Sequence, residues 1–180
     1  NFIESLALKG FNPVTSLLEF QAINIDEVEI TGIDIQAAWF LGKQFEQLQN
    51  WTLRASYSRQ NSEDKSTGEE LESILPSQTV VGLGYGDFDA NWRAELSVTQ
   101  TAAVNQANTE EITYFRADSH TLLDLTGHYQ VTDNVRLSGG IFNLFDKEYY
   151  QVSEVRGRTI DEDLSRFSSP GRNASINVVV

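Results

Sequence analysis

The side chains of this chain best suited to chemistry are His120 and His128, because the sequence contains no Cys. A zinc site of the usual His/Cys type cannot be assembled from two imidazoles and no thiolate. Ser and Asp are plentiful, but no nucleophile-elbow pattern and no alternation of strand with helix would position a Ser/His/Asp triad. We therefore expect no catalysis and no metal site built by these residues.

The elements that carry the histidines are strands, since apolar and polar residues alternate along most of the chain. Leu123 and Leu125 alternate with Asp124 and Thr126, so the predicted strand has an apolar (dry) face and a polar (wet) face. His128 falls on the wet face. The pattern predicts strands near residues 50–60, 76–86, 91–101, 121–131, 135–149 and 171–180. An earlier strand over 27–39 changes phase midway, which predicts a bulge near Thr31 and Gly32.

The connections between these strands alternate between long (61–75, 102–120 and 150–170) and short (87–90 and 132–134). A soluble sheet has no reason to sort its loops by length, whereas an outer-membrane barrel has short turns at one rim and long loops at the other. We therefore predict an all-β fold, an antiparallel meander that forms part of a large transmembrane β-barrel. Its strands should pair with their sequence neighbours, with no helix longer than about two turns.

Bulky aromatic residues gather on the dry face at the short-turn ends, as expected of a girdle in the headgroup zone. The alternative is a set of core aromatics in a soluble β-sandwich. On the wet face, the alternating Gly82, Gly84 and Gly86 would relieve crowding in a lumen or allow another element to approach. The girdle residues are Trp39, Trp51, Tyr85, Trp92 and Tyr129.

Composition excludes several classes of protein. The apolar stretches are too short for a membrane-spanning helix of about 20 residues. With 26 acidic and 13 basic residues the net charge is −13, which disfavours nucleic acid as a partner. Much of the acidity lies in the first long loop, which reads as a solvated segment. Its charged residues are Glu63, Asp64, Lys65, Glu69, Glu70 and Glu72. The chain has no Met and starts with Asn1 in an apparent strand, so we expect a piece of a longer protein.

The segment GGIFNLFDKEYY, residues 139–150, closely resembles the penultimate strand of TonB-dependent outer-membrane receptors. Upstream, Asn24 followed by Gly32-Ile33-Asp34 resembles another strand of that family, with Asp34 in place of the more usual Glu, and 74–76 resembles the return from a long outer loop. One departure is the end of the chain, where the family usually has an aromatic residue and this chain has Val180. The motif residues are Asn143, Leu144, Phe145, Asp146, Lys147, Tyr149, Pro170, Gly171 and Arg172.

The resemblance implies that residues 1–180 are the C-terminal part of a plugged barrel of ~22 strands in the outer membrane of a Gram-negative bacterium. The plug and the N-terminal strands would lie outside this stretch. Transport would be driven by the TonB complex acting through that missing region, and lipid and lipopolysaccharide would surround the wall.

Several segments are most similar to haem and haemoglobin receptors, namely Phe2-Ile3-Glu4, Asn24-Ile25-Asp26 and Val155-Arg156-Gly157. The transported ligand would then be haem or a ferric siderophore, and a haem-carrier protein could be a partner. Candidate contacts in the last long loop are aromatic and cationic, suited to a planar carboxylated ligand: Tyr149, Tyr150, Arg156, Arg158 and Arg166. His120, at the long-loop end of its strand, is a candidate haem contact because imidazole coordinates haem iron. The alternatives are a receptor for another nutrient, a passive porin, and a soluble β-sandwich or lipocalin-like binding module.

Overall fold

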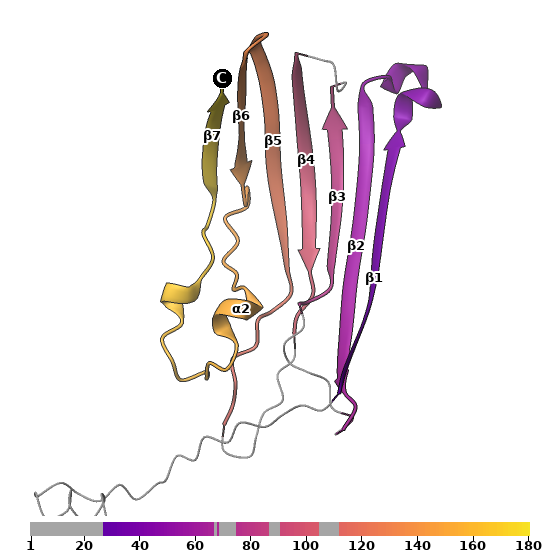
Figure 1. Ribbon diagram of the computed structural model, residues 1–180. Coiled ribbons are helices and arrows are strands. Elements are labelled where there is room, and N and C mark those ends of the chain that lie inside the picture. Colours follow the sequence, from indigo (N-terminus) through magenta and orange to yellow (C-terminus); the bar gives the residue numbers. More distant parts are fainter. Residues whose placement is uncertain (1–26, 67, 69–74, 87–90, 105–111) are drawn as a thin grey trace, which may run out of the picture.

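Seven strands form a single antiparallel sheet in the order β1-β2-β3-β4-β5-β6-β7, which confirms the predicted meander (Figure 1). The computed structural model describes residues 27–66, 68, 75–86, 91–104 and 112–180. The strands are β1 (Val28–Phe40), β2 (Trp51–Asp64), β3 (Gln78–Tyr85), β4 (Trp92–Thr101), β5 (His120–Thr132), β6 (Val135–Phe142) and β7 (Asn173–Val179). Short helical segments lie between them: η1 (Leu41–Lys43), η2 (Glu46–Leu48), α2 (Val152–Val155) and η3 (Ser165–Phe167). Among the described residues, no helix has the length and apolarity needed to cross a membrane.

The connections are sorted by length, as the sequence predicts. The end of β1 and the start of β2, the end of β3 and the start of β4, and the end of β5 and the start of β6 lie at one end of the sheet in Figure 1. The strand ends that flank the longer connections lie at the opposite end. The β5–β6 hairpin is the tightest of the described turns, with Thr132 paired to Val135 and a register shift between Gln130 and Thr132.

One face of the sheet is apolar over its whole width. A single row of register partners crosses every strand, namely Trp39, Leu53, Leu83, Leu96, Leu125, Ile141 and Ala174. Leu83, Leu96 and Leu125 are each about 40% exposed, because no second layer covers this face in the described part of the chain. A β-sandwich would bury these side chains between two sheets, so the single open layer excludes that alternative.

The predicted aromatic residues lie on this apolar face near the short-turn end. Trp51 packs edge-on against Tyr85, with ring centroids 5.0 Å apart, and Tyr85 lies 5.3 Å from Trp92. Trp92 is in turn the register partner of Tyr129. Neighbouring strands thus contribute one continuous aromatic belt at a common depth, the arrangement expected at a membrane interface.

The opposite face is polar and carries a compact charge cluster. Glu95 accepts from Arg54 at 3.2 Å and from Arg93 at 3.3 Å. A Cβ on Gly82 would lie 2.9 Å from Glu95 Oε1, and a Cβ on Gly84 would lie 2.8 Å from Arg93 Nη2. The two glycines therefore relieve crowding on the polar face, as predicted. Gly86 has a different role, since it follows β3 with a φ of +114° that favours glycine.

The predicted bulge near Thr31 and Gly32 is wrong, because the β1–β2 register runs unbroken from Val28 paired with Asp64 to Phe40 paired with Thr52. The faces exchange polarity instead, as Glu29 and Glu63 sit on the face that carries Ile33 and Ile35 further along. Lys65 bridges these two carboxylates, at 2.8 and 3.0 Å. The hydrogen bonds that the Lys65 ammonium donates, first to Glu29 and then to Glu63, hold the pKa of Lys65 above its ordinary value. The phase change therefore reflects different surroundings at the long-loop end of β1 and β2, where Val28 pairs with Asp64.

Two strand boundaries also differ from the prediction. β2 continues to Asp64, into the segment expected as a loop, while β6 ends at Phe142 and does not reach residue 149. The strand stops because Asn143 has a φ of 52°, which is incompatible with an extended ladder. The predictions for Phe2-Ile3-Glu4, Asn24, Glu69, Glu70, Glu72 and Ile74 lie outside the described residues.

Candidate functional site

The long connections before β5 and before β7 pack together as one unit with its own apolar core. Ala117 from the first and Val152 and Val155 from the second are buried, with Val155 only 1% exposed. Leu164 is buried in the same connection. In the part of the chain that the structure describes, every apolar side chain classed as buried belongs to these loops. The outer loops thus have a hydrophobic core that the strands themselves lack. Partly buried side chains around the core are Val104, Phe115, Tyr150 and Phe167.

Backbone hydrogen bonds tie the two connections to each other. Tyr114 and Thr159 form an isolated antiparallel bridge, in which Phe115 N donates to Arg158 O at 2.8 Å and Ile160 N donates to Thr113 O at 3.2 Å. The loops therefore form a joint surface at this end of the sheet.

The motif at 143–147 closes the base of the last loop. Asn143 is 3% exposed, and its side-chain Oδ1 accepts from Lys147 N at 2.8 Å. Its Nδ2 donates to Lys147 O at 2.8 Å and to Pro170 O at 3.4 Å, while its backbone N donates to Asp124 Oδ1 at 2.7 Å. One side chain thus joins the start of the loop to its end.

Asp146 supplies the second half of this closure. Its Oδ1 accepts from Arg172 N at 2.7 Å, and a Cβ on Gly171 would lie 2.5 Å from that oxygen. Asp146 has a φ of 54°, a conformation that Asp and Asn tolerate better than most residues. We call Asn143, Asp146, Pro170, Gly171 and Arg172 the loop clamp. Of the other motif residues, Leu144 N donates to Leu123 O at 2.8 Å, and Phe145 is 76% exposed.

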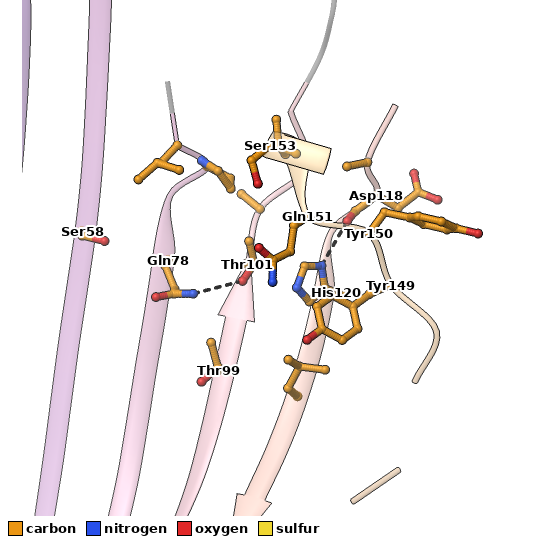
Figure 2. Close-up of a pocket in the computed structure, with 16 residues that line it drawn as sticks. Ser58, Gln78, Thr99, Thr101, Asp118, His120, Tyr149, Tyr150, Gln151 and Ser153 are labelled. Atoms are coloured by element: carbon orange, nitrogen blue, oxygen red, sulfur yellow. Dashed lines mark hydrogen bonds between the residues drawn. The ribbon is translucent and has the colours of Figure 1, made fainter. Parts of the chain in front are cut away.

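A pocket of about 350 Å³ lies between the clamped loop and the adjoining ends of β2 to β5 (Figure 2). Strand residues on the polar face form its floor, and the loop residues that follow Tyr149 form its cover. The lining comprises Ser58, Leu75, Pro76, Gln78, Thr99, Thr101, Ala102, Ala117, Asp118, His120, Leu122, Tyr149, Tyr150, Gln151, Val152 and Ser153.

Two rings predicted from the sequence meet in this pocket. The His120 and Tyr149 ring centroids are 4.5 Å apart with an interplanar angle of 33°, and His120 Nδ1 lies 3.4 Å from Asp118 O. Tyr150 also lines the pocket, packs edge-on against Phe115 at 5.2 Å and donates to Glu148 Oε1 at 3.1 Å. That hydrogen bond raises the pKa of the Tyr150 phenol.

The predicted cations lie elsewhere. Arg158 and Arg166 both pack on the Phe167 ring, at 4.7 and 4.8 Å from its centroid, and Arg158 Nη1 lies 3.2 Å from Glu162 Oε2. Arg156 is exposed just after α2. None of the three arginines is among the described residues that line the pocket.

His128 is also remote from the pocket, on the polar face of β5 and in register with Arg93. In the described ranges, no group of three or more His, Asp or Glu side chains is arranged to hold a metal ion. The sequence did not single out Gln78, Thr99, Thr101 or Gln151, which line the pocket. The alternation places the strand residues on the wet face, but it carries no sign of which loop covers them.

Comparison with known proteins identifies the sheet. The family "TonB dependent receptor-like, beta-barrel" matches residues 1–144. The "Probable hemoglobin and hemoglobin-haptoglobin-binding protein 4" of Haemophilus influenzae is 25% identical, over 89% of this chain and 18% of its own length. The "Vitamin B12 transporter BtuB" of Photobacterium profundum is 30% identical, over 73% of this chain and 21% of its own length.

Among solved structures, the copper transporter OprC superimposes with a TM-score of 0.67 and 26% identity, covering 84% of this chain and 23% of that chain. The chain spans about a fifth of the length of the curated relatives that it matches. Its apolar face and polar face thus correspond to the lipid-facing and lumen-facing sides of a barrel wall. The chain belongs to the TonB-dependent receptor β-barrel family, outer-membrane receptors of Gram-negative bacteria that are transporters and not enzymes.

Proposed function

We propose that residues 1–180 are the C-terminal part of the wall and outer mouth of a receptor that imports an iron complex, with haem as the first candidate. The relative from Haemophilus influenzae, whose name refers to hemoglobin binding, supports this substrate because it matches 89% of the chain.

The observation that carries the proposal is the pairing of His120 with Tyr149 in the pocket wall. Imidazole and phenolate are both side-chain groups that hold haem iron, and an aromatic ring also stacks on a flat ligand. The pair lies at the long-loop end of the wall, where a ligand arriving from outside first meets the lumen.

The partners follow from the family and from the exposed surface. The TonB complex would act through a region upstream of these strands, and membrane lipid and lipopolysaccharide would contact the apolar face. Arg156 and Arg166 are exposed on the last loop. They would meet a haem-carrier protein or the carboxylates of a ligand before it enters the pocket, since guanidinium binds carboxylates in a fixed fork.

Growth of a receptor-deficient strain that carries the full-length protein tests this function, with haem as the sole iron source. The unmodified receptor should support growth that depends on TonB, which a passive porin would not require. His120→Ala with Tyr149→Ala should weaken haem binding about tenfold, equivalent to about 1.4 kcal/mol, at normal surface expression. The matched control is His128→Ala, on the same strand outside the pocket. Unchanged binding by the double variant would remove the pocket from the haem site.

A ferric siderophore, or another nutrient, is the second candidate. It is favoured by the pocket itself, because none of its described lining residues is Lys or Arg, whereas the propionates of haem call for such cations. Failure of the unmodified receptor to bind haem, together with TonB-dependent uptake of a siderophore, would establish this alternative.

A further inference from the structure

The last long loop leaves the sheet through an irregularity beside β5. The β5–β6 register pairs Leu125 with Ile141, so an unbroken ladder would go on to pair Leu123 with Asn143. In the structure, Leu123 O accepts instead from Leu144 N at 2.8 Å. Two residues of the exit thus face one residue of β5, as in a β-bulge, and the first of them has a φ of 52°. The backbone N–H of Asn143 therefore loses the ladder acceptor that the register would give it.

Asp124 supplies a replacement for that acceptor. Its Oδ1 accepts from Asn143 N at 2.7 Å, a short hydrogen bond of the charge-assisted kind. Asp124 is half-buried on the polar face of β5, in register with Ser97. Asn143 is only 3% exposed, and a buried N–H without an acceptor is costly. The Asp124 carboxylate therefore stabilises the point at which the chain leaves the sheet.

This exit decides which residue of the loop lies opposite His120. Continued in the same register by equal steps along both strands, the ladder would place Asp146 opposite His120, on the polar face. The structure places Tyr149 there instead, with the two ring centroids 4.5 Å apart. A turn closed by Asp146 N donating to Asn143 O at 2.8 Å takes up the intervening residues. The offset thus exchanges a carboxylate for a phenol ring beside the imidazole.

We infer that Asp124 is a positioning residue for the pocket, because its carboxylate fixes the exit that brings Tyr149 against His120. The inference rests on the proposed function, in which this ring pair takes part in uptake. Asp124 is not among the described residues that line the pocket, and it acts through Asn143. The loop clamp joins the two ends of the loop to each other, whereas Asp124 joins the first end to the strand that carries His120.

Fluorine NMR of the full-length receptor tests the inference without any ligand. A 3-fluorotyrosine is placed at position 149, and its resonance is compared with and without His120→Ala, because a neighbouring aromatic ring shifts a fluorine resonance. This His120-dependent shift is measured in the unmodified background and in Asp124→Ala, Asp124→Asn and Thr126→Ala. The Asn variant keeps an acceptor oxygen, and Thr126 is the matched control on the same strand and face. A second label at Tyr129, in the aromatic belt, reports whether the wall of each variant is folded.

We expect the His120-dependent shift to be lost in Asp124→Ala and kept in Asp124→Asn and Thr126→Ala. A shift retained in Asp124→Ala, or lost equally in Thr126→Ala, would overturn the inference. If the label at Tyr129 shows that Asp124→Ala is unfolded, Asp124→Ser takes its place, since the shorter side chain falls short of Asn143 N. A resonance of the unmodified receptor that does not respond to His120→Ala would remove the ring pair and the inference with it. Failure to bind haem would count against the proposed function and leave the shift unaffected.

Discussion

Asp146 accepts a hydrogen bond at 2.7 Å from the backbone N–H of Arg172, which lies 26 positions later in the chain. With Asn143, which reaches Pro170 O, this contact makes the two ends of the last long loop neighbours. The motif that identifies the family in the sequence therefore has a local mechanical role in this chain, since it fixes where the cover of the pocket begins and ends.

Asn143→Ala in the full-length receptor should loosen the loop between residues 148 and 169. The substitution leaves the partners of a buried amide unsatisfied, at a cost of about 1–3 kcal/mol, and adds strain because Ala tolerates positive φ poorly. Limited proteolysis should show faster cleavage in this loop. Lys147→Ala is the control, because only the backbone of Lys147 contacts the clamp. Equal cleavage of the two variants would mean that the clamp does not hold the loop.

Leu125→Arg should destabilise the intact barrel by about 2–4 kcal/mol if that face meets lipid. Leu125 is 39% exposed on the apolar face, whereas the next residue, Thr126, is on the polar face in register with Glu95. Thr126→Arg should therefore cost much less. Unfolding in liposomes would measure both free energies, and equal costs would contradict the assignment of the two faces.

Glycine substitutions should differ in cost according to what surrounds them. A Cβ on Gly139 would lie 2.5 Å from the backbone oxygen of Ser175, whereas a Cβ on Gly82 would lie 2.9 Å from the side-chain oxygen Oε1 of Glu95. We expect Gly139→Ala to lower the free energy of unfolding by about 1–3 kcal/mol, the usual cost of overpacking. Gly82→Ala should cost less, because the carboxylate of Glu95 can move aside. Denaturant unfolding of the two variants would check the order, and a larger loss for Gly82→Ala would contradict it.

Lowering the pH should destabilise the part of the last loop between residues 158 and 165. The backbone N–H of Thr159 and then the guanidinium of Arg158 hold the pKa of Glu162 below its usual range, and hydrogen bonds from Ser165 do the same for the pKa of Asp163. A carboxyl group with a lowered pKa in the folded state adds stability above its unfolded pKa, and this stability is lost as pH falls through the folded value. The contribution should therefore be complete above about pH 5 and decline below about pH 4.

Hydrogen exchange of the loop amides, corrected for the intrinsic pH dependence, would measure this change. Glu162→Gln should reduce the pH sensitivity of Thr159, while Glu154→Gln on the same loop should leave it intact. The same pH profile in both variants would show that Glu162 is not the group responsible.

The strands and their faces were predictable because the alternation of apolar and polar residues depends on one property. That property is whether a side chain faces apolar or aqueous surroundings. Leu96 and Leu125 alternate with Glu95 and Thr126 for that reason, and the register confirms it. The same logic explains the error at Thr31. The shift in the apolar–polar alternation was interpreted as a β-bulge in the backbone. The β1–β2 pairing is unbroken, and it is the surroundings of the two faces that change along the strand.

The site was only partly predictable, since it depends on contacts between distant segments. His120 and Tyr149 were named for their chemistry, and the structure brings them together at 4.5 Å. The sequence could not predict that Arg158 and Arg166 lie away from the pocket, because their position follows from packing on Phe167. The loop core around Val155 was equally hidden, as a short helix in a long loop leaves no periodic signal.

The loop core implies that two parts of the chain acquire their structure in different solvents. The strands leave Leu96 and Leu125 uncovered by protein, so their stability depends on the surrounding lipid. Val152 and Val155 are covered by the loop itself and by Ala117, so that region can order in water as soon as the clamp brings its ends together. We therefore expect the order of the outer loops to depend less on the composition of the bilayer than the stability of the strands does.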